Sequence, residues 1–236
     1  MSLERLINGG DSLRLVADDV SACRQCPRLV EWREEVATTK RAAYRHETYW
    51  GRGVPGFGDP AARILVLGLA PAAHGANRTG RMFTGDRSGD FLYSALHRNG
   101  LASQPESVSI DDGLELHDVF ITSPVKCAPP ANQPTPAERD TCRPFLVREL
   151  AALDRLRVVV ALGAFGFSQA LRLLGATGHT APRFSHGAEV ELPGGATLLG
   201  SYHVSQQNTF TGRLTPAMFD DVLRRAIELG HTTSFK

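Results

Sequence analysis

The sequence contains little lysine: Lys40, Lys126 and Lys236 are its only lysines among 236 residues. The net charge is +1, so the composition argues against a globally basic nucleic-acid binder. Arginine supplies most of the positive charge and suits bidentate phosphate contacts. A role in DNA binding would require those arginines to gather on one face, which a sequence does not reveal.

Long apolar stretches are absent as well. No run approaches the roughly 18 to 20 residues that a membrane-spanning helix requires, and Met1 to Asp11 contain no apolar signal core. We therefore expect a cytoplasmic protein without a membrane partner. Internal repeats and low-complexity linkers are also missing, and a hydrophobic content of 42% predicts a single domain over residues 1–236.

Cysteine is scarce, and its placement is informative. The four cysteines are Cys23, Cys26, Cys127 and Cys142, and the first two form a Cys-x-x-Cys. Because reducing cytoplasm disfavours disulfides, this pattern favours a metal site. Four thiolates complete either a zinc site or an iron–sulfur cluster. The alternative is that all four are buried free thiols.

Short apolar runs alternate with helical segments along the chain. Residues 63–69, 119–122 and 157–162 are typical of strands buried on both faces of a parallel sheet. Residues 189–192 and 197–201 flank a Pro-Gly-Gly turn and predict a hairpin that leads into a fourth core strand. Helices are expected at 12–36, which carries the Cys-x-x-Cys, at 88–98, from Thr135, from Gly163 and at 215–229. This alternation predicts a three-layer α/β/α sandwich with a central, mainly parallel four-stranded sheet.

Polar loops follow three of the predicted strands, at residues 70–86, 123–132 and 202–213. Ligands of open parallel sheets bind beyond the carboxyl ends of the strands, so these loops predict a pocket. The first loop has neither G-x-G-x-x-G nor G-K-[ST], which argues against dinucleotide and nucleoside-triphosphate sites. Taken alone, Asp86 is either a helix cap or a pocket residue, and His203 is either structural or catalytic.

Two of these loops resemble known signature segments. Gly68-Leu-Ala-Pro-Ala-Ala-His-Gly-Ala-Asn-Arg-Thr-Gly-Arg-Met-Phe-Thr-Gly-Asp86 and His203-Val-Ser-Gln-Gln-Asn208 resemble those of family 5, or type b, uracil-DNA glycosylases. These enzymes also carry a [4Fe–4S] cluster on four cysteines. The surroundings of Cys23, Cys26 and Cys127 are similar to the family's cluster segments, with Cys142 as the fourth ligand. The resemblance extends from about residue 22 to the last helix.

The resemblance implies a reaction, in which the N-glycosidic bond of a damaged base in DNA is hydrolysed and an abasic site remains. The nucleotide must first leave the base stack and enter a pocket. The catalytic residues implied are Asp86, His203 and Asn132. The base-binding residues implied are Gly68, Leu69, Ala70, Phe83, Ser123, Asn132 and His203. The DNA-binding residues implied are His74, Asn77, Arg78, Gln206, Gln207, Asn208, Thr209 and Arg213.

Three features of this sequence refine that expectation. Leu69 and Ala70 are apolar where related families have a catalytic acid, so we expect Asp86 to carry that role. Ser123 stands where uracil-specific families have an asparagine, which predicts a broader range of bases, hypoxanthine included. Lys126 is the only lysine near a motif, so we expect a monofunctional enzyme that does not cut the strand through a Schiff base.

Two other functions agree with parts of the sequence. One is a catalytically weak, damage-binding iron–sulfur protein of the same fold, suggested by the apolar Leu69 and Ala70. The other is an electron-transfer protein whose α/β domain only holds a cluster, which leaves Asp86 and His203 unexplained. For the glycosylase we expect one [4Fe–4S] cluster without a catalytic metal, damaged DNA as partner, and a monomer acting at the chromosome. Zinc is the alternative metal.

Overall fold

The computed structural model describes residues 12–176 and 182–232. The predicted domain over residues 1–236 includes three stretches, 1–11, 177–181 and 233–236, that lie outside the described residues. Within the described ranges, no helix combines the length and the hydropathy that crossing a bilayer would require.

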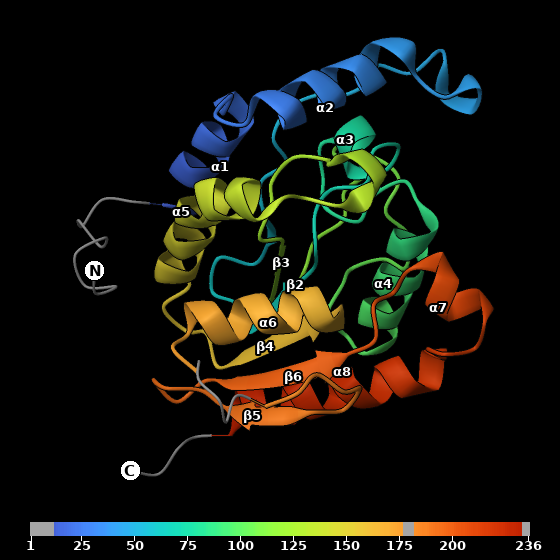
Figure 1. The fold of residues 1–236 in the computed structure, drawn as a ribbon. Coiled ribbons are helices and arrows are strands. Elements are labelled where there is room, and N and C mark those ends of the chain that lie inside the picture. The colour runs from blue at the N-terminus through green and yellow to red at the C-terminus, as the bar shows by residue number, and fades with distance from the viewer. Residues whose placement is uncertain (1–11, 177–181, 233–236) are drawn as a thin grey trace.

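A six-stranded sheet forms the centre of the fold (Figure 1). Its strands, in chain order, are β1 (Phe57–Gly58), β2 (Ile64–Leu67), β3 (Val119–Thr122), β4 (Val158–Leu162), β5 (Glu189–Glu191) and β6 (Thr197–Ser201). They are arranged as β1-β3-β2-β4-β6-β5, with the four inner strands parallel. The predicted count of four strands is therefore wrong for the whole sheet, because the short edge strands β1 and β5 each add an antiparallel pair.

Strand β2 shows why these sequences form inner strands. All four of its residues are buried. Ile64 and Val66 enter the hydrophobic cluster on one face of the sheet, whereas Leu65 and Leu67 enter the cluster on the other. Successive side chains of a strand point to opposite faces, so a continuous apolar run is stable only where both faces are covered.

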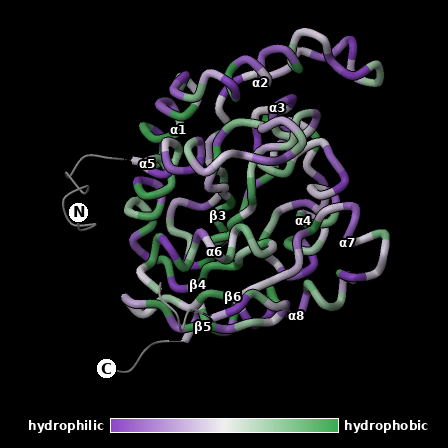
Figure 2. The backbone as a smooth tube through the Cα atoms, in the orientation of Figure 1, coloured by the Kyte–Doolittle hydropathy of each residue, from purple (hydrophilic) through white to green (hydrophobic). Residues whose placement is uncertain are grey.

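Helices cover both faces. They are α1 (Leu13–Ala22), α2 (Pro27–Thr39), α3 (Ala76–Thr79), α4 (Arg87–Arg98), α5 (Pro136–Ala152), α6 (Gly163–Leu173), α7 (Gln206–Phe210) and α8 (Pro216–His231), with 3₁₀ turns at Ala42–Tyr44 and Pro130–Asn132. Helices α5 and α6 pack on one face and α4 and α8 on the other. The predicted three-layer α/β/α sandwich is confirmed. Figure 2 shows hydrophobic residues along β4 and β6, in the lower half of the molecule as drawn.

Local sequence signals fix where several helices begin. The hydroxyl of Thr135 accepts a hydrogen bond from the backbone N–H of Glu138, and the Glu138 carboxylate accepts one from the N–H of Thr135. This is the predicted capping box, with Pro136 in the first turn. The predicted helical region at 12–36 is two helices, α1 and α2, separated by the Cys-x-x-Cys segment.

The connections between strands place the loops at one edge. From β2 the chain crosses through α4 to β3 on one side, whereas from β4 it crosses through α6 to β6 on the other. The crossover direction therefore reverses between the adjacent strands β2 and β4. In open α/β sheets, a reversal of this kind opens a crevice at the carboxyl ends of the strands.

Candidate active site and metal centre

A cavity of about 370 Å³ lies at the carboxyl ends of the inner strands. Residues from all three predicted loops line it. The predicted residues that meet there are Leu69, Ala70, Phe83, Asp86, Ser123, Asn132, His203 and Gln207. The sequence-based expectation of a pocket formed by three loops is therefore confirmed. Asp86 and His203, far apart in the sequence, line the same cavity.

Phe83 owes its position to two glycines. Its backbone is left-handed, with φ of 53°, a conformation that bulky residues rarely adopt. A Cβ on Gly89 would collide with the carbonyl oxygen of Phe83, and a Cβ on Gly68 would stand 2.9 Å from the Phe83 Cζ. The ring therefore lies against the bare backbone of Gly68 at the end of β2. Strain of about 1–3 kcal/mol, typical of such backbone, is tolerated where the surrounding structure enforces it.

The two carboxylate oxygens of Asp86 lie in different surroundings. Its Oδ1 accepts hydrogen bonds from the backbone N–H groups of Ser88 at 2.9 Å and Gly89 at 3.0 Å, which caps helix α4. Its Oδ2 lies against Gly75, where any side chain would collide with it. Oδ2 has no hydrogen-bond donor among the described residues. Burial raises the pKa of Asp86, and the two backbone donors oppose that rise.

His203 lies beside Phe83 in the cavity. The two ring centroids are 6.2 Å apart, with the planes inclined by 38°. Burial lowers the pKa of His203 to about 4, so the imidazole is neutral near pH 7. A neutral imidazole still donates one N–H hydrogen bond, so it can stabilise negative charge without itself being charged.

Ser123 and Asn132 contribute differently to the cavity. The Ser123 hydroxyl is buried and donates to the backbone carbonyl of Val125 over 2.8 Å. The Asn132 side chain is exposed and has no hydrogen-bond partner in the described part of the chain. Asn132 and its neighbour Ala131 both have positive φ, of 56° and 52°. Asparagine tolerates this conformation better than alanine does, so the strain concentrates at Ala131.

Sequence reasoning missed several residues of the cavity. The additional lining residues are Pro71, Ala72, Met82, Ser88 and Ser205. Each of them lies within two residues of a predicted residue in the sequence, but none has a side chain whose chemistry singles it out. The strained backbone at Ala131 also had no sequence signal, because alanine usually occupies ordinary helical or extended conformations.

Three residues of the first loop were expected to bind DNA, and the structure uses two of them internally. Asn77 is fully buried and its amide donates to the backbone carbonyl of Arg33. Arg78 is 9% exposed, pairs with Glu47, and donates to the carbonyl of Gly85 over 2.7 Å. Both side chains therefore hold the loop that presents Asp86, and their contact with DNA stays a prediction.

His74, the third of these residues, is half-buried. Its Nδ1 lies 3.1 Å from the hydroxyl of Tyr49. Burial lowers the pKa of His74, and the nearby cations Arg41 and Arg78 lower it further. A neutral His74 is thus favoured near pH 7, which makes an ion pair with a phosphate unfavourable for it.

The segment after His203 forms the short helix α7 (Figure 1), and Gln207 on this helix lines the cavity. Gln206 and Gln207 are exposed, and Phe210 at the end of α7 is 74% exposed. Asn208 and Thr209 instead bond to the backbone: Asn208 Nδ2 donates to the carbonyl of His203 over 2.8 Å, and Thr209 Oγ1 donates to that of Ser205.

The four cysteines come together, although Cys23 and Cys26 lie about a hundred residues before Cys127 and Cys142. All four line one small cavity between α1, α2 and α5. As placed, no three His, Cys, Asp or Glu side chains within residues 12–176 and 182–232 form a group that could hold a single metal ion. Zinc needs its ligands about 2.3 Å from one point, whereas a [4Fe–4S] cluster has four ligands placed around it.

The surroundings of Arg33 indicate whether the four cysteines suit an anionic iron–sulfur cluster. Its side chain is buried, and Nη1 donates to Cys127 Sγ over 2.9 Å. Nη2 donates to the carbonyl of Cys23, while Nε has no partner among the described residues. No carboxylate of the described chain pairs with this guanidinium. A buried cation is costly unless it is compensated, so an anionic cluster of four thiolates fits its position.

The alternative, four buried free thiols without a metal, has its own chemical consequence. Burial raises the pKa of Cys142 to about 12, although the backbone N–H of Lys126 donates to its sulfur over 3.2 Å. Without a metal, Cys142 would therefore be protonated and inert near neutral pH. A bound metal ion or cluster supplies the positive charge that keeps coordinating thiols deprotonated.

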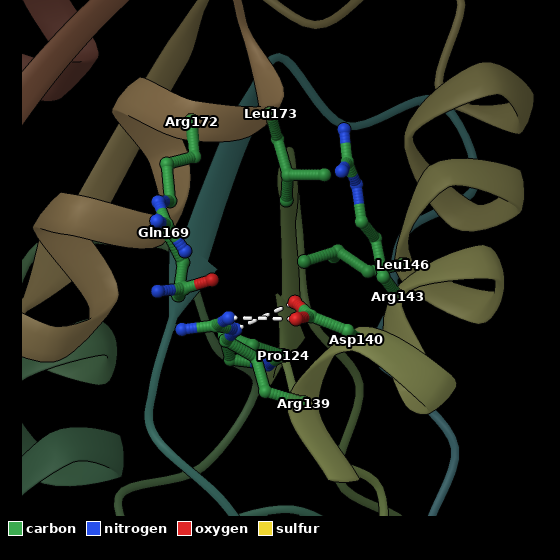
Figure 3. Close-up of a pocket in the computed structure, with 8 residues that line it drawn as sticks. All are labelled: Pro124, Arg139, Asp140, Arg143, Leu146, Gln169, Arg172 and Leu173. Carbon is green, nitrogen blue, oxygen red and sulfur yellow. Dashed lines mark hydrogen bonds and ion pairs between the residues drawn. The ribbon is translucent and has the colours of Figure 1, made fainter. Parts of the chain in front are cut away.

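A second cavity, of about 330 Å³, lies between α5 and α6 (Figure 3). Three arginines, Arg139, Arg143 and Arg172, line it, and Asp140 pairs with Arg139 over 2.8 Å. None of the residues expected to contact DNA or the base reaches it. Elsewhere many arginines pair with carboxylates, as Arg63 does with Asp118 and Arg81 with Asp112. The arginine bias thus stabilises the fold at least in part.

Comparison with known proteins gives a consistent result. A family model described as the uracil DNA glycosylase superfamily matches residues 55–226. The chain belongs to that superfamily. A type-5 uracil-DNA glycosylase of Mycobacterium tuberculosis is 59% identical over 225 residues, covering 95% of this chain and 84% of the relative. One of Thermus thermophilus is 57% identical over 210 residues, covering 89% and 94%.

Type-4 relatives are similar over a smaller part of the chain than these type-5 relatives. A type-4 uracil-DNA glycosylase of Archaeoglobus fulgidus is 39% identical, but over only 113 residues, or 48% of this chain and 49% of the relative. The predicted resemblance to type-5 uracil-DNA glycosylases is therefore confirmed. Members of this superfamily are hydrolases that act on N-glycosidic bonds in DNA.

Proposed function

We propose that this protein is a monofunctional DNA repair glycosylase that releases uracil and other deaminated bases, such as hypoxanthine, and leaves an abasic site. The observation that carries the proposal is the shared cavity of Phe83, Asp86 and His203. An aromatic ring, a carboxylate and an imidazole in one crevice suit a base and the bond that joins it to the sugar.

Each of the three side chains supports one part of the reaction. Phe83 offers a stacking surface for the extruded base, and such stacking contributes about 1–3 kcal/mol per base. The sugar becomes oxocarbenium-like as the bond breaks, so the negative Asp86 stabilises it. His203 donates a hydrogen bond to the departing base, whose negative charge grows in the transition state.

The water molecule that attacks the sugar requires a group that accepts its proton. Asp86 Oδ2 is not engaged by donors of the described chain, and a raised pKa makes this carboxylate a better proton acceptor. In the proposed step the bond between sugar C1′ and the base nitrogen breaks with its electron pair on the base. The water oxygen then bonds to C1′, and its proton passes to Asp86. The exposed amide of Asn132 assists by holding the water or the base.

The surroundings of Ser123 support the proposal that the enzyme accepts a broad range of bases. Its hydroxyl is committed to the carbonyl of Val125, so it offers the base no fixed pair of donor and acceptor groups. A site with fixed groups rejects unmatched bases strongly, and a site without them selects mainly by shape. Stacking on Phe83 tolerates many bases, because every base has a flat face.

A hydrolytic mechanism without a Schiff base is supported by Lys126. Its ammonium group is buried, pairs with Glu149 over 2.6 Å and also donates to Thr122. A Schiff base requires a neutral amine that reaches the sugar C1′. Lys126 does not line the cavity of Phe83 and Asp86, and no lysine within the described ranges does.

We further propose one [4Fe–4S] cluster held by Cys23, Cys26, Cys127 and Cys142. The shared cavity of the four thiols and the uncompensated Arg33 support it. When bound, the cluster would link the segment between α1 and α2, the loop after β3 and helix α5, and no step of base release passes through it. We also propose that the enzyme acts as a monomer at the chromosome.

The test uses purified protein and a panel of duplexes, each with one uracil, hypoxanthine or normal base. Free base is measured directly, and abasic sites are measured as strand breaks after alkali. Release of uracil and hypoxanthine, with breaks only after alkali, supports the proposal. Tight binding to the damaged duplexes without release would favour the damage-binding alternative, which Leu69 and Ala70 suggest by their lack of a carboxylate.

A further inference from the structure

Side chains hold the backbone that carries His203 at three points. The N–H of Tyr202 donates to His186 Nδ1 over 3.1 Å. The carbonyl of Tyr202 accepts from the Ser201 hydroxyl over 3.0 Å, and the carbonyl of His203 accepts from Asn208 Nδ2 over 2.8 Å. Strand β6 ends at Ser201, so these groups have left the sheet ladder and require other partners.

His186 makes a second contact with the same segment. Its ring stacks on the ring of Tyr202, with centroids 5.0 Å apart and planes inclined by only 21°. Arg213 lies over the Tyr202 ring as well, with its Cζ 4.6 Å from the centroid. Tyr202 is thus fixed through its backbone and through its ring, and the next residue is His203.

The sequence around Gly200 explains how His186 reaches this position. A Cβ on Gly200 would stand 2.5 Å from the carbonyl oxygen of Ser185, so only glycine allows the 185–188 loop to approach β6. The N–H of Gly187 donates to the carbonyl of Gly200 over 2.8 Å, and the N–H of Gly200 donates to the carbonyl of Ala188. The loop is therefore paired with β6 at Gly200, two residues before the Tyr202 amide that His186 accepts.

We infer that His186 is a positioning residue that holds the Tyr202–His203 backbone so that the His203 imidazole faces the base. The inference rests on the proposed function, which gives His203 its contact with the departing base. The bond from Tyr202 requires an unprotonated Nδ1, so the neutral ring carries its proton on Nε2. Burial lowers the pKa of His186 in support of that form, while the backbone of Met218 and the Asp221 carboxylate oppose it.

Two substitutions separate the acceptor from the ring. His186→Asn keeps an acceptor at the position of Nδ1 but removes the stacked ring. His186→Phe keeps the ring but removes the acceptor. Single-turnover release of uracil and affinity for an uncleavable duplex are measured for both variants and for the wild type. Hydrogen exchange of the Tyr202 amide, followed by NMR, reports on the backbone contact independently of catalysis.

We expect His186→Phe to release uracil about tenfold more slowly or worse, since displacement of a catalytic group by about 1 Å costs up to about 10²-fold. Its affinity for DNA should stay within about twofold, and its Tyr202 amide should exchange faster. His186→Asn should restore both rate and protection. Wild-type rates and wild-type protection in His186→Phe would overturn the inference, as would a His186→Asn as slow as His186→Phe. Failure of the wild type to release any base would instead contradict the proposed function.

Discussion

The ring of Phe83 lies against the backbone of Gly68, at the point where strand β2 enters the cavity. A Cβ on residue 68 would stand 2.9 Å from Phe83 Cζ, which real Cβ atoms essentially never show, and 3.1 Å from Cε2. The stacking surface for the base and the end of the first core strand are therefore one packed unit. The position of strand β2 therefore determines where the Phe83 ring can stack on a base.

We predict that Gly68→Ala slows base release, because the added methyl group pushes the Phe83 ring out of its stacking position. Loss of a stacking contact of about 1–3 kcal/mol corresponds to a decrease of roughly 5- to 150-fold. Single-turnover release of uracil measures the effect. Gly230→Ala in α8 is the control, since a Cβ there meets Arg63 and Ile64 only at ordinary distances of 3.7 Å. Equal rates for the two variants would contradict the assignment of Phe83.

A second prediction concerns the charge of His203. Burial lowers its pKa to about 4 from an ordinary value of 6.5, so the imidazole stays neutral as pH falls through 6.5. We expect no increase in the rate of base release centred near pH 6.5. The measurement is a single-turnover pH profile of wild type and His203→Gln. An increase near pH 6.5 that disappears in His203→Gln would show that the charged imidazole is the active form.

The same shift has a consequence for stability. Between pH 6.5 and about 4 the unfolded chain binds a proton at residue 203 that the folded chain does not bind. The free energy of unfolding should therefore decrease as pH falls through this window. Urea denaturation at pH 7 and pH 5 should show a smaller decrease for His203→Gln than for wild type. Equal decreases would mean that His203 is not buried in its neutral form.

Much of the fold could be predicted because short apolar runs such as 63–69 and 157–162 are typical of strands buried on both faces of a sheet. Strand β1 could not be predicted, since Phe57–Gly58 is too short to show a periodic pattern. The cavity could be predicted from where its loops leave the sheet. Which side chains of those loops bond to the protein's own backbone could not. Asn77, Arg78 and Asn208 have side chains that suit DNA, yet all three satisfy backbone carbonyls of neighbouring segments.

A third prediction concerns strand cleavage. Because Lys126 is buried and paired with Glu149, we expect no covalent intermediate between enzyme and sugar. Borohydride added during the reaction on a uracil duplex should trap no protein–DNA adduct. The reaction products should show strand breaks only after alkali. A trapped adduct, or nicking by pure enzyme at neutral pH, would contradict a monofunctional mechanism.

A fourth prediction concerns the metal centre. The purified protein should be brown and contain about four iron atoms per chain if all four cysteines hold a [4Fe–4S] cluster. Arg33→Met should lose iron more readily, since changes beside metal ligands typically cost about 10- to 100-fold in affinity. Iron content and visible absorption measure both. Arg24→Met, which removes an exposed arginine paired with Glu34, is the control.

Two results would contradict this assignment. If the purified protein is colourless and contains zinc, the four cysteines bind zinc and not an iron–sulfur cluster. Equal iron retention in Arg33→Met and wild type would show that the buried guanidinium does not compensate an anionic cluster. In that case the hydrogen bond from Arg33 to Cys127 would have to be explained by packing alone.

The Asp86 carboxylate, and not only its helix cap, is central to the proposed release of the base. Asp86→Asn tests this role most directly, because asparagine caps a helix about as well as aspartate but carries no charge. We predict that Asp86→Asn keeps its fold and its affinity for a uracil duplex, while single-turnover release of uracil decreases by about 10²- to 10⁴-fold. Release at the wild-type rate would contradict the role assigned to Asp86.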